Sequence, residues 1–179
     1  GKLSAPLRSR FTMPCRMDYY TAEDLCTILA RSAKVLDIAA ESDGMHEIAR
    51  RSRGTPRIAN NLLRWVRDYA QVMHKENTII TREVASHALQ KLDIDDDGLD
   101  EMDNRILEAL LVKFKGRPVG LKSLAVAVGE EESTIEDVYE PYLIQEGYLL
   151  RTPAGRIVTS KGEKRFGINK ITGKQPELF

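Results

Sequence analysis

The stretch Gly54-Thr55-Pro56-Arg57-Ile58-Ala59-Asn60-Asn61 has the residues of a helix start. Gly54 ends the helical pattern before it, and Thr55 is a candidate N-cap, because its hydroxyl can accept a hydrogen bond from a free backbone N–H. Pro56 suits the first helical position, where its missing N–H costs nothing. Arg57 then lies beside free N–H groups at the positive end of the helix dipole, an arrangement that favours a bound anion. The spacing alone also fits a solvated arginine without a ligand.

Residues 21–92 show the spacing of four amphipathic helices. The first begins with a capping-box pattern formed by Thr21 and Asp24. Because each helix has one apolar stripe, we expect the four to pack as a small bundle. The predicted helix starts are Thr21, Ser42, Pro56 and Thr81. In the third helix we expect the core to take Ile58, Leu62, Trp65, Val66, Tyr69 and Met73.

Arginines are frequent in the second and third predicted helices. Only Arg57 is assigned to phosphate binding, because it alone lies at a helix start beside Pro56. The others are expected to form a solvated face, as a run of charge on a helix usually does. They are Arg50, Arg51, Arg53, Arg64 and Arg67.

The acidic stretch Asp93–Asp100 is short and contains Gly98, as linkers between domains often do. Its aspartates partly match a calcium-binding loop. The bidentate glutamate expected at the twelfth position is replaced by Asn104, so we expect no calcium site. Acidic residues before a helix are better explained by the helix dipole.

Residues 99–168 show the pattern of three helices followed by a β-hairpin, which is typical of a winged-helix domain. The third helix is predicted to begin with a capping box at Ser133–Glu136 and to be kinked or shortened by Pro141. The hairpin is predicted to have a three-residue loop, Pro153–Gly155. Such a domain places its third helix or its wing on DNA. The side chains of the third helix that we expect to face the core are Ile135, Val138, Tyr139 and Leu143.

Charge indicates which part of this domain would meet DNA. The third helix is rich in glutamate and aspartate, which repel phosphates, so we place the contact at the wing, through phosphates and without sequence preference. The candidate DNA-binding residues are Arg151, Arg156 and Lys161. A basic surface without a ligand is the alternative. The basic residues of the wing and the segment after it are Arg151, Arg156, Lys161, Lys164, Arg165, Lys170 and Lys174.

Composition narrows the class of protein. The chain has 179 residues, of which 42% are hydrophobic and 30% charged, and its formal net charge is zero. No apolar run is long enough to span a membrane or to act as a secretory signal, so we expect a cytoplasmic protein. Cys15 and Cys26 are expected to be reduced, a disulfide between them being the alternative. Three scattered histidines predict no metal site.

A phosphate-binding loop of the form Gly-x4-Gly-Lys-Ser/Thr is absent from the sequence. No apolar strand that ends in paired carboxylates, and so could help to hold magnesium, is present either. We therefore do not expect this chain to hydrolyse ATP alone; the family resemblance given below implies that it is a fragment that begins after a phosphate-binding subdomain.

Several segments resemble the RuvB family, the bacterial Holliday-junction branch-migration motors of the AAA+ class. Gly54–Asn60 resembles the start of the family's sensor 2 helix. Pro6–Phe11 resembles its arginine-finger segment, from which Ser9 and Thr12 depart. The likeness runs from Leu3 to about Ile168. Further matches to the family's carboxy-terminal domain are Gly129–Glu131, Thr134–Val138, Glu140–Gln145 and Arg151–Pro153.

The resemblance implies roles for individual residues. Arg10 corresponds to the arginine finger that acts on a neighbouring subunit's ATP, with Arg8 as the nearest rival. Arg57, with Pro56 and Ile58, corresponds to a nucleotide-binding site in which Ile58 packs against adenine. The intact protein would use ATP or ADP with Mg²⁺, none of which this chain is expected to hold alone.

The resemblance also implies partners and domains. The intact protein would be a homohexameric ring on duplex DNA at Holliday junctions, working with a RuvA-like junction-binding protein and a RuvC-like resolvase in recombination and repair. The expected divisions are residues 1–20, the end of a large AAA+ subdomain; 21–98, a helical lid; 99–168, a winged helix; and 169–179, a disordered tail. The rival interpretations are a winged-helix transcriptional regulator that binds duplex DNA and a purely structural oligomerisation fragment.

Overall fold

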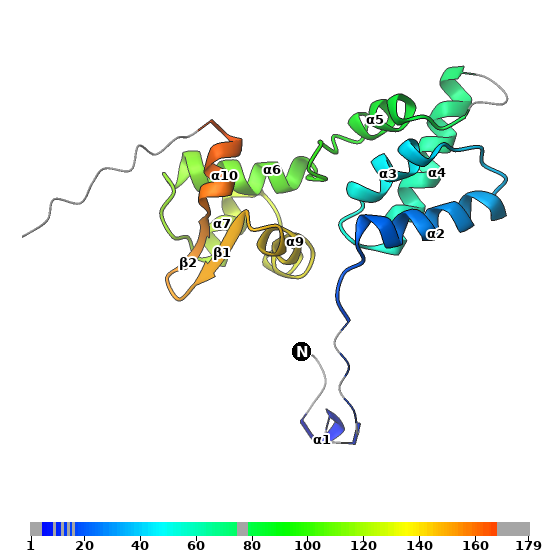
Figure 1. Cartoon of the computed structure of the whole chain (residues 1–179). Coiled ribbons are helices and arrows are strands. Elements are labelled where there is room, and N and C mark those ends of the chain that lie inside the picture. Colours follow the sequence, from blue (N-terminus) through cyan, green and yellow to red (C-terminus); the bar gives the residue numbers. More distant parts are fainter. Residues whose placement is uncertain are drawn as a thin grey trace, which may run out of the picture. The chain divides into compact units, whose positions relative to one another are not determined.

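The computed structural model describes residues 5–8, 10, 11, 13, 15, 17–74 and 79–167 (Figure 1). The chain divides into two compact units, Gly1–Arg82 and Glu83–Phe179, and the fold is mostly helical, as predicted. None of the described helices combines the length and the apolar character that a bilayer span requires. The first unit contains α1 (Ala5–Arg8), α2 (Ala22–Val35), α3 (Ser42–Arg50) and α4 (Pro56–His74), and α5 (Arg82–Gln90) begins at its end.

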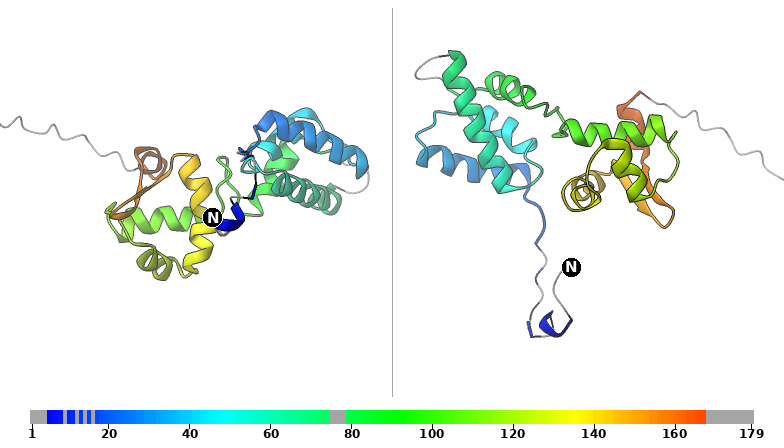
Figure 2. Two further views of the ribbon diagram at one scale, coloured as in Figure 1. Left: turned by 90° about the horizontal axis from the view of Figure 1, so that it is seen from below. Right: turned by 180° about the vertical axis from the view of Figure 1, so that it is seen from behind.

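The helices α2, α3 and α4 pack on one another in the first unit (Figures 1 and 2). The capping box at the start of α2 is confirmed: Asp24 N–H donates to Thr21 Oγ1 at 3.2 Å, and Thr21 N–H donates to the Asp24 carboxylate at 3.3 Å. The starts predicted at Ser42 and Pro56 are also observed. Local side-chain chemistry therefore fixes where these helices begin.

The buried face of α4 differs from the predicted one. Trp65 is 38% exposed and Met73 is 59% exposed, so their placement in the core was wrong. Alanine, leucine and valine positions at helical spacing form the buried stripe, and its alanines let neighbouring helices approach closely. The sequence-based choice had favoured the larger apolar residues. The buried residues of α4 are Ala59, Leu62, Leu63, Val66 and Ala70.

The second unit contains one hydrophobic core built from its helices and its hairpin. Leu107, Leu124 and Leu143, from three different helices, are all fully buried in it. This order of helices followed by a hairpin is the predicted winged-helix arrangement. After α5 the elements are α6 (Glu101–Glu108), the π-helical turn η1 (Ala109–Lys113), α7 (Leu121–Val128), α8 (Glu132–Thr134), the π-helical turn η2 (Ile135–Tyr139), α9 (Glu140–Gln145), β1 (Leu149–Thr152), β2 (Gly155–Val158) and α10 (Ser160–Arg165).

The third predicted helix is observed as α8, η2 and α9 in direct succession. The predicted capping box at Ser133–Glu136 is wrong, because the N-cap is Glu131 and no side chain caps the helix. The π-helical turn lies just before Pro141, which cannot donate a backbone hydrogen bond, so the predicted disturbance by this proline is present as a widened turn. The widened turn also leaves Val138 55% exposed rather than buried.

The wing is an antiparallel pair in which Arg151 lies opposite Arg156. Its loop has two residues rather than the predicted three, because Gly155 pairs with Thr152 and belongs to β2. Gly155 has a φ of +129° and lies against the backbone of Val119, where an added Cβ would come 2.3 Å from the carbonyl oxygen. Only glycine therefore fits this position without strain.

Helix α10 was not predicted from the sequence. Thr159 caps it by accepting a hydrogen bond from Gly162 N–H at 3.3 Å, and the same hydroxyl donates to Gly147 O at 2.6 Å. The basic residues Lys161, Lys164 and Arg165 are therefore held on a helix beside the wing. Lys170, Lys174 and the predicted tail 169–179 lie outside the described residues.

We expect the change Gly155→Ala to lower the free energy of unfolding by about 3 kcal/mol, through backbone strain and the clash with Val119. Urea unfolding followed by circular dichroism measures this. Gly147→Ala is the matched control, because Gly147 has a φ of +70° with no neighbouring atom within 4 Å. It should cost about 1 kcal/mol. Equal costs at both positions would show that the close approach to Val119 is unimportant.

Candidate nucleotide and nucleic-acid sites

The turn before α4 is fixed by the chain that enters the helical bundle. Arg53 and Gly54 have φ values of +52° and +61°, so this turn takes two successive left-handed residues. Tyr20 N–H donates to Gly54 O at 2.9 Å, and a Cβ on Gly54 would lie 2.7 Å from Cβ of Tyr19. The hydroxyl of Thr55 donates to Arg53 O at 3.1 Å. These contacts set where the first turn of α4 begins.

Arg57 is exposed in the first turn of α4, next to the half-buried Pro56 and Ile58. No acidic residue lies in this described turn, so the guanidinium is not neutralised by its own helix start. The free N–H groups and the dipole of a helix of this length favour a bound anion at such a point. The three nucleotide-binding candidates are thus adjacent, and an anion could reach the arginine.

A buried carboxylate holds the end of α3, just before this turn. Glu47 is 3% exposed and accepts hydrogen bonds from Arg50 at 2.6 and 2.8 Å and from the buried Arg51, while Arg82 Nε lies at 3.8 Å. Burial by itself raises the pKa of Glu47, but the hydrogen bonds and charges of Arg50 and Arg51 outweigh it and lower the pKa. The expectation that Arg51 belongs to a solvated face was therefore wrong.

The arginine-finger candidate Arg10 is exposed in a turn after α1, where its N–H donates to Leu7 O at 3.2 Å. The side chain of its rival Arg8, and all of Ser9 and Thr12, lie outside the described residues. Both cysteine thiols are free. The described part of the segment 15–19 forms no strand.

The two wing arginines turn toward the third helix. Arg156 donates to the buried Glu140 at 2.5 and 3.3 Å, and Arg151 Nη2 lies 2.9 Å from the same carboxylate. Arg151 also pairs with Glu136, and this hydrogen bond raises the pKa of the guanidinium. The acidic third helix and the basic wing thus neutralise each other in part, which the sequence alone did not indicate.

Lys161, the third DNA-binding candidate, lies on α10 with its side chain 51% exposed. Its Nζ donates to Glu146 O at 2.6 Å and lies 4.2 Å from the ring centroid of Tyr148. Tyr148 is buried, and this burial is the main reason that its pKa is raised to about 12. The ammonium group is therefore positioned by an aromatic face, a carbonyl and the Glu146 carboxylate, whose Oε2 lies 3.6 Å away, while it stays open to solvent.

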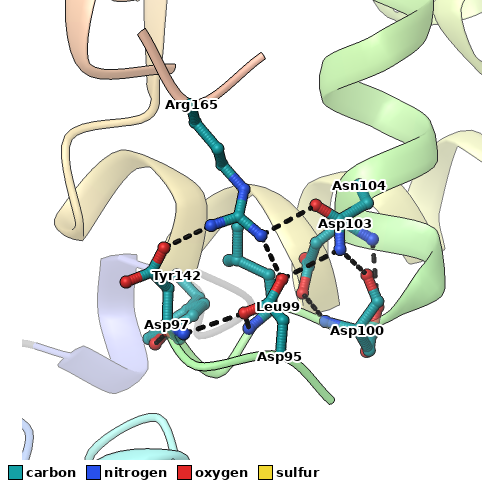
Figure 3. A network of polar contacts seen from close by, with 8 residues as sticks. All are labelled: Asp95, Asp97, Leu99, Asp100, Asp103, Asn104, Tyr142 and Arg165. Carbon is teal, nitrogen blue, oxygen red and sulfur yellow. Dashed lines mark hydrogen bonds and ion pairs between the residues drawn. The ribbon is translucent and has the colours of Figure 1, made fainter. Parts of the chain in front are cut away.

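Arg165 is bound to the acidic linker and not to the wing (Figure 3). Its guanidinium pairs with Asp95 and Asp97 and donates to Asn104 Oδ1 at 3.3 Å. Asp95 also accepts hydrogen bonds from the backbone N–H groups of Asp97 and Leu99, at 2.9 and 3.0 Å. Two aspartates of the partial calcium-loop pattern, Asp95 and Asp97, thus pair with Arg165, and Asp95 also accepts a hydrogen bond from the side-chain amide of Asn104. In the described part of the chain, no group of three or more potential ligand side chains could hold a metal ion.

Comparison with known proteins agrees with this architecture. Residues 20–95 match the family model of the RuvB AAA lid domain, and residues 96–167 match that of the RuvB C-terminal winged helix domain. The structure of the Thermotoga maritima RuvB Holliday junction branch migration motor is similar at 44% identity with a TM-score of 0.86, over 93% of this chain and 55% of that one. A point mutant of Thermotoga maritima RuvB is similar at 45% identity and a TM-score of 0.85, over 92% and 54%.

A helical lid of the AAA type, followed by a winged-helix domain, is therefore the class of structure that this chain adopts. Both matched domains are RuvB domains, and the second match begins at the residue after the first one ends. The chain belongs to the RuvB family. It spans about half the length of the solved relatives that it matches.

We expect Glu47→Gln to destabilise the first unit by about 3–5 kcal/mol, because the buried Arg51 loses its anionic partner. Fluorescence of Trp65, the only tryptophan, follows its unfolding in urea. The pKa of Glu47 is lowered from 4.5, so its stabilisation is complete above that pH and is lost as the pH falls through the lower value. The variant should lack that part of the acid dependence. The exposed Glu41→Gln is the matched control, and an equal loss in both variants would contradict this role of Glu47.

Proposed function

We propose that this chain is the carboxy-terminal part of an ATP-dependent DNA motor that drives branch migration at Holliday junctions in recombination and repair. The observation that carries the proposal is the match of both domains, over most of the chain, to RuvB family models and to a solved branch migration motor. The intact protein would act as a homohexamer with ATP and Mg²⁺. Its partners would be a RuvA-like junction-binding protein and a RuvC-like resolvase.

The nucleotide would be sensed at the start of α4. The exposed Arg57 would contact its phosphates, and Ile58, beside Pro56, would pack against the adenine. Arg10 would stabilise the transferring phosphoryl group in a neighbouring subunit, as arginine fingers do. Rings that mix Arg10→Ala subunits with subunits unable to bind ATP test this last role, since turnover at their shared interfaces should be lost.

DNA would be held by the wing and by α10. The side chains of Arg151 and Lys161 are about half exposed, which supports a direct contact with phosphates. Arg156 is only 12% exposed and paired with a buried carboxylate, so we assign it the different role of anchoring the wing. Contacts made only to phosphates carry no sequence information, as a translocating protein requires.

For DNA binding, we expect weak affinity for duplexes of any sequence, falling with salt at a log–log slope of about one per phosphate contact. Arg151→Ala should weaken binding and reduce the slope by about one. Fluorescence anisotropy over a salt series measures both. Lys91→Ala, at an exposed site outside the wing, removes the same charge and should change little. Salt-insensitive binding would contradict the proposal, and a footprint at one defined operator would favour a transcriptional regulator.

For nucleotide sensing, we expect Arg57→Ala in the full-length protein to abolish ATP-driven branch migration and to leave the fold intact. The guanidinium is exposed, so its loss should not alter packing. Migration assays on a synthetic four-way junction measure the effect. Arg64→Ala, which removes an exposed arginine from the same helix, is the control. Normal migration by the Arg57 variant would refute its sensor role.

A further inference from the structure

The ion pairs of the wing differ in their access to solvent. Arg156 and Glu140 have side chains 12% and 2% exposed, whereas those of Arg151 and Glu136 are 47% and 46% exposed. An exposed ion pair contributes little to stability, so another anion can replace its carboxylate at little cost. Breaking a buried pair instead leaves an unpaired buried charge, which is costly. A phosphate that approaches the wing can therefore replace Glu136 more easily than Glu140.

Within this cluster the charges balance. The guanidinium groups of Arg151 and Arg156 face the carboxylates of Glu136 and Glu140. The cluster thus offers no net positive charge to a phosphate as long as Glu136 stays bound. If Glu136 leaves, one positive charge is uncovered at the most exposed point of the cluster.

Arg151 would remain in place after such an exchange. It keeps its contact with Glu140 at 2.9 Å, and Glu140 is in turn held by Arg156. Both ion pairs of Arg151 use its Nη2 atom, whereas a guanidinium has five N–H donors in total. The side chain can therefore be oriented by Glu140 and still present donors to a phosphate.

We propose that Glu136 competes with DNA phosphates for Arg151 and thereby sets how weakly the wing holds duplex DNA. This inference rests on the proposed function, because it requires that the wing contacts DNA. A carboxylate that returns to Arg151 whenever a phosphate departs keeps the guanidinium paired throughout. The wing can then pass from one phosphate to the next without leaving a bare charge between them.

The first test is Glu136→Gln in this 179-residue chain. Glutamine keeps the size and a hydrogen-bond acceptor but removes the charge, so Arg151 should be released to DNA. We expect the dissociation constant for a labelled duplex at low salt to fall about two- to fivefold, the range given by an exposed ion pair. Fluorescence anisotropy measures it, and circular dichroism confirms that the variant is folded.

A matched control separates competition from general repulsion. Glu132 is exposed one turn earlier and forms no ion pair with the described part of the wing. Glu132→Gln removes the same charge, and it should change the affinity less than Glu136→Gln does. An equal gain in both variants would show that repulsion alone is responsible and would overturn the inference.

The decisive comparison repeats Glu136→Gln in an Arg151→Ala background. With Arg151 absent there is nothing to compete for, so the second change should raise the affinity no more than Glu132→Gln does. A gain in this background as large as that of Glu136→Gln alone, or an unchanged affinity of the single variant Glu136→Gln, overturns the inference and leaves DNA binding by the wing intact. If neither the wild type nor Glu136→Gln binds duplex DNA at low salt, the proposed DNA contact fails, and the inference fails with it.

Discussion

The wing depends on one buried carboxylate. The hairpin has only four residues in each strand, and so small a pair has little stability of its own in water. Glu140, 1% exposed at the start of α9, receives the guanidinium groups of both wing strands. Two backbone hydrogen bonds between Val119 and Arg156, at 2.7 and 2.9 Å, attach the edge of β2 that does not pair with β1. The position of the candidate DNA-binding side chains follows from these two attachments.

Local signals were sufficient to predict most of the fold. The capping box at Thr21 and the proline at the start of α4 both act on the backbone close to them, so their effect can be read from neighbouring residues. The buried face of α4 could not be predicted in the same way. Its orientation depends on how closely other helices approach, which favours Ala59 and Ala70 over the larger Trp65.

The candidate sites were predicted less completely than the fold. The position of Arg57 follows from sequence, because a helix start is a local feature. The partners of Arg156 and Arg165 lie 16 and up to 70 residues away, so no spacing rule could pair them with Glu140 and Asp95. Sequence therefore identified a basic region, but the structure shows that much of its charge is already paired within the domain.

The π-helical turn η2 adds a dependence on chain length. Such a turn contains one residue more than an α-helical turn, and it separates α8 from Glu140 at the start of α9. Deleting one residue within 135–139 would therefore turn the widened turn into an ordinary α-helical turn, and Glu140 would keep its orientation relative to α8. A further inserted residue would have no such turn to take it up and would rotate Glu140 by about 100° away from the hairpin. The segment should therefore tolerate a deletion better than an insertion.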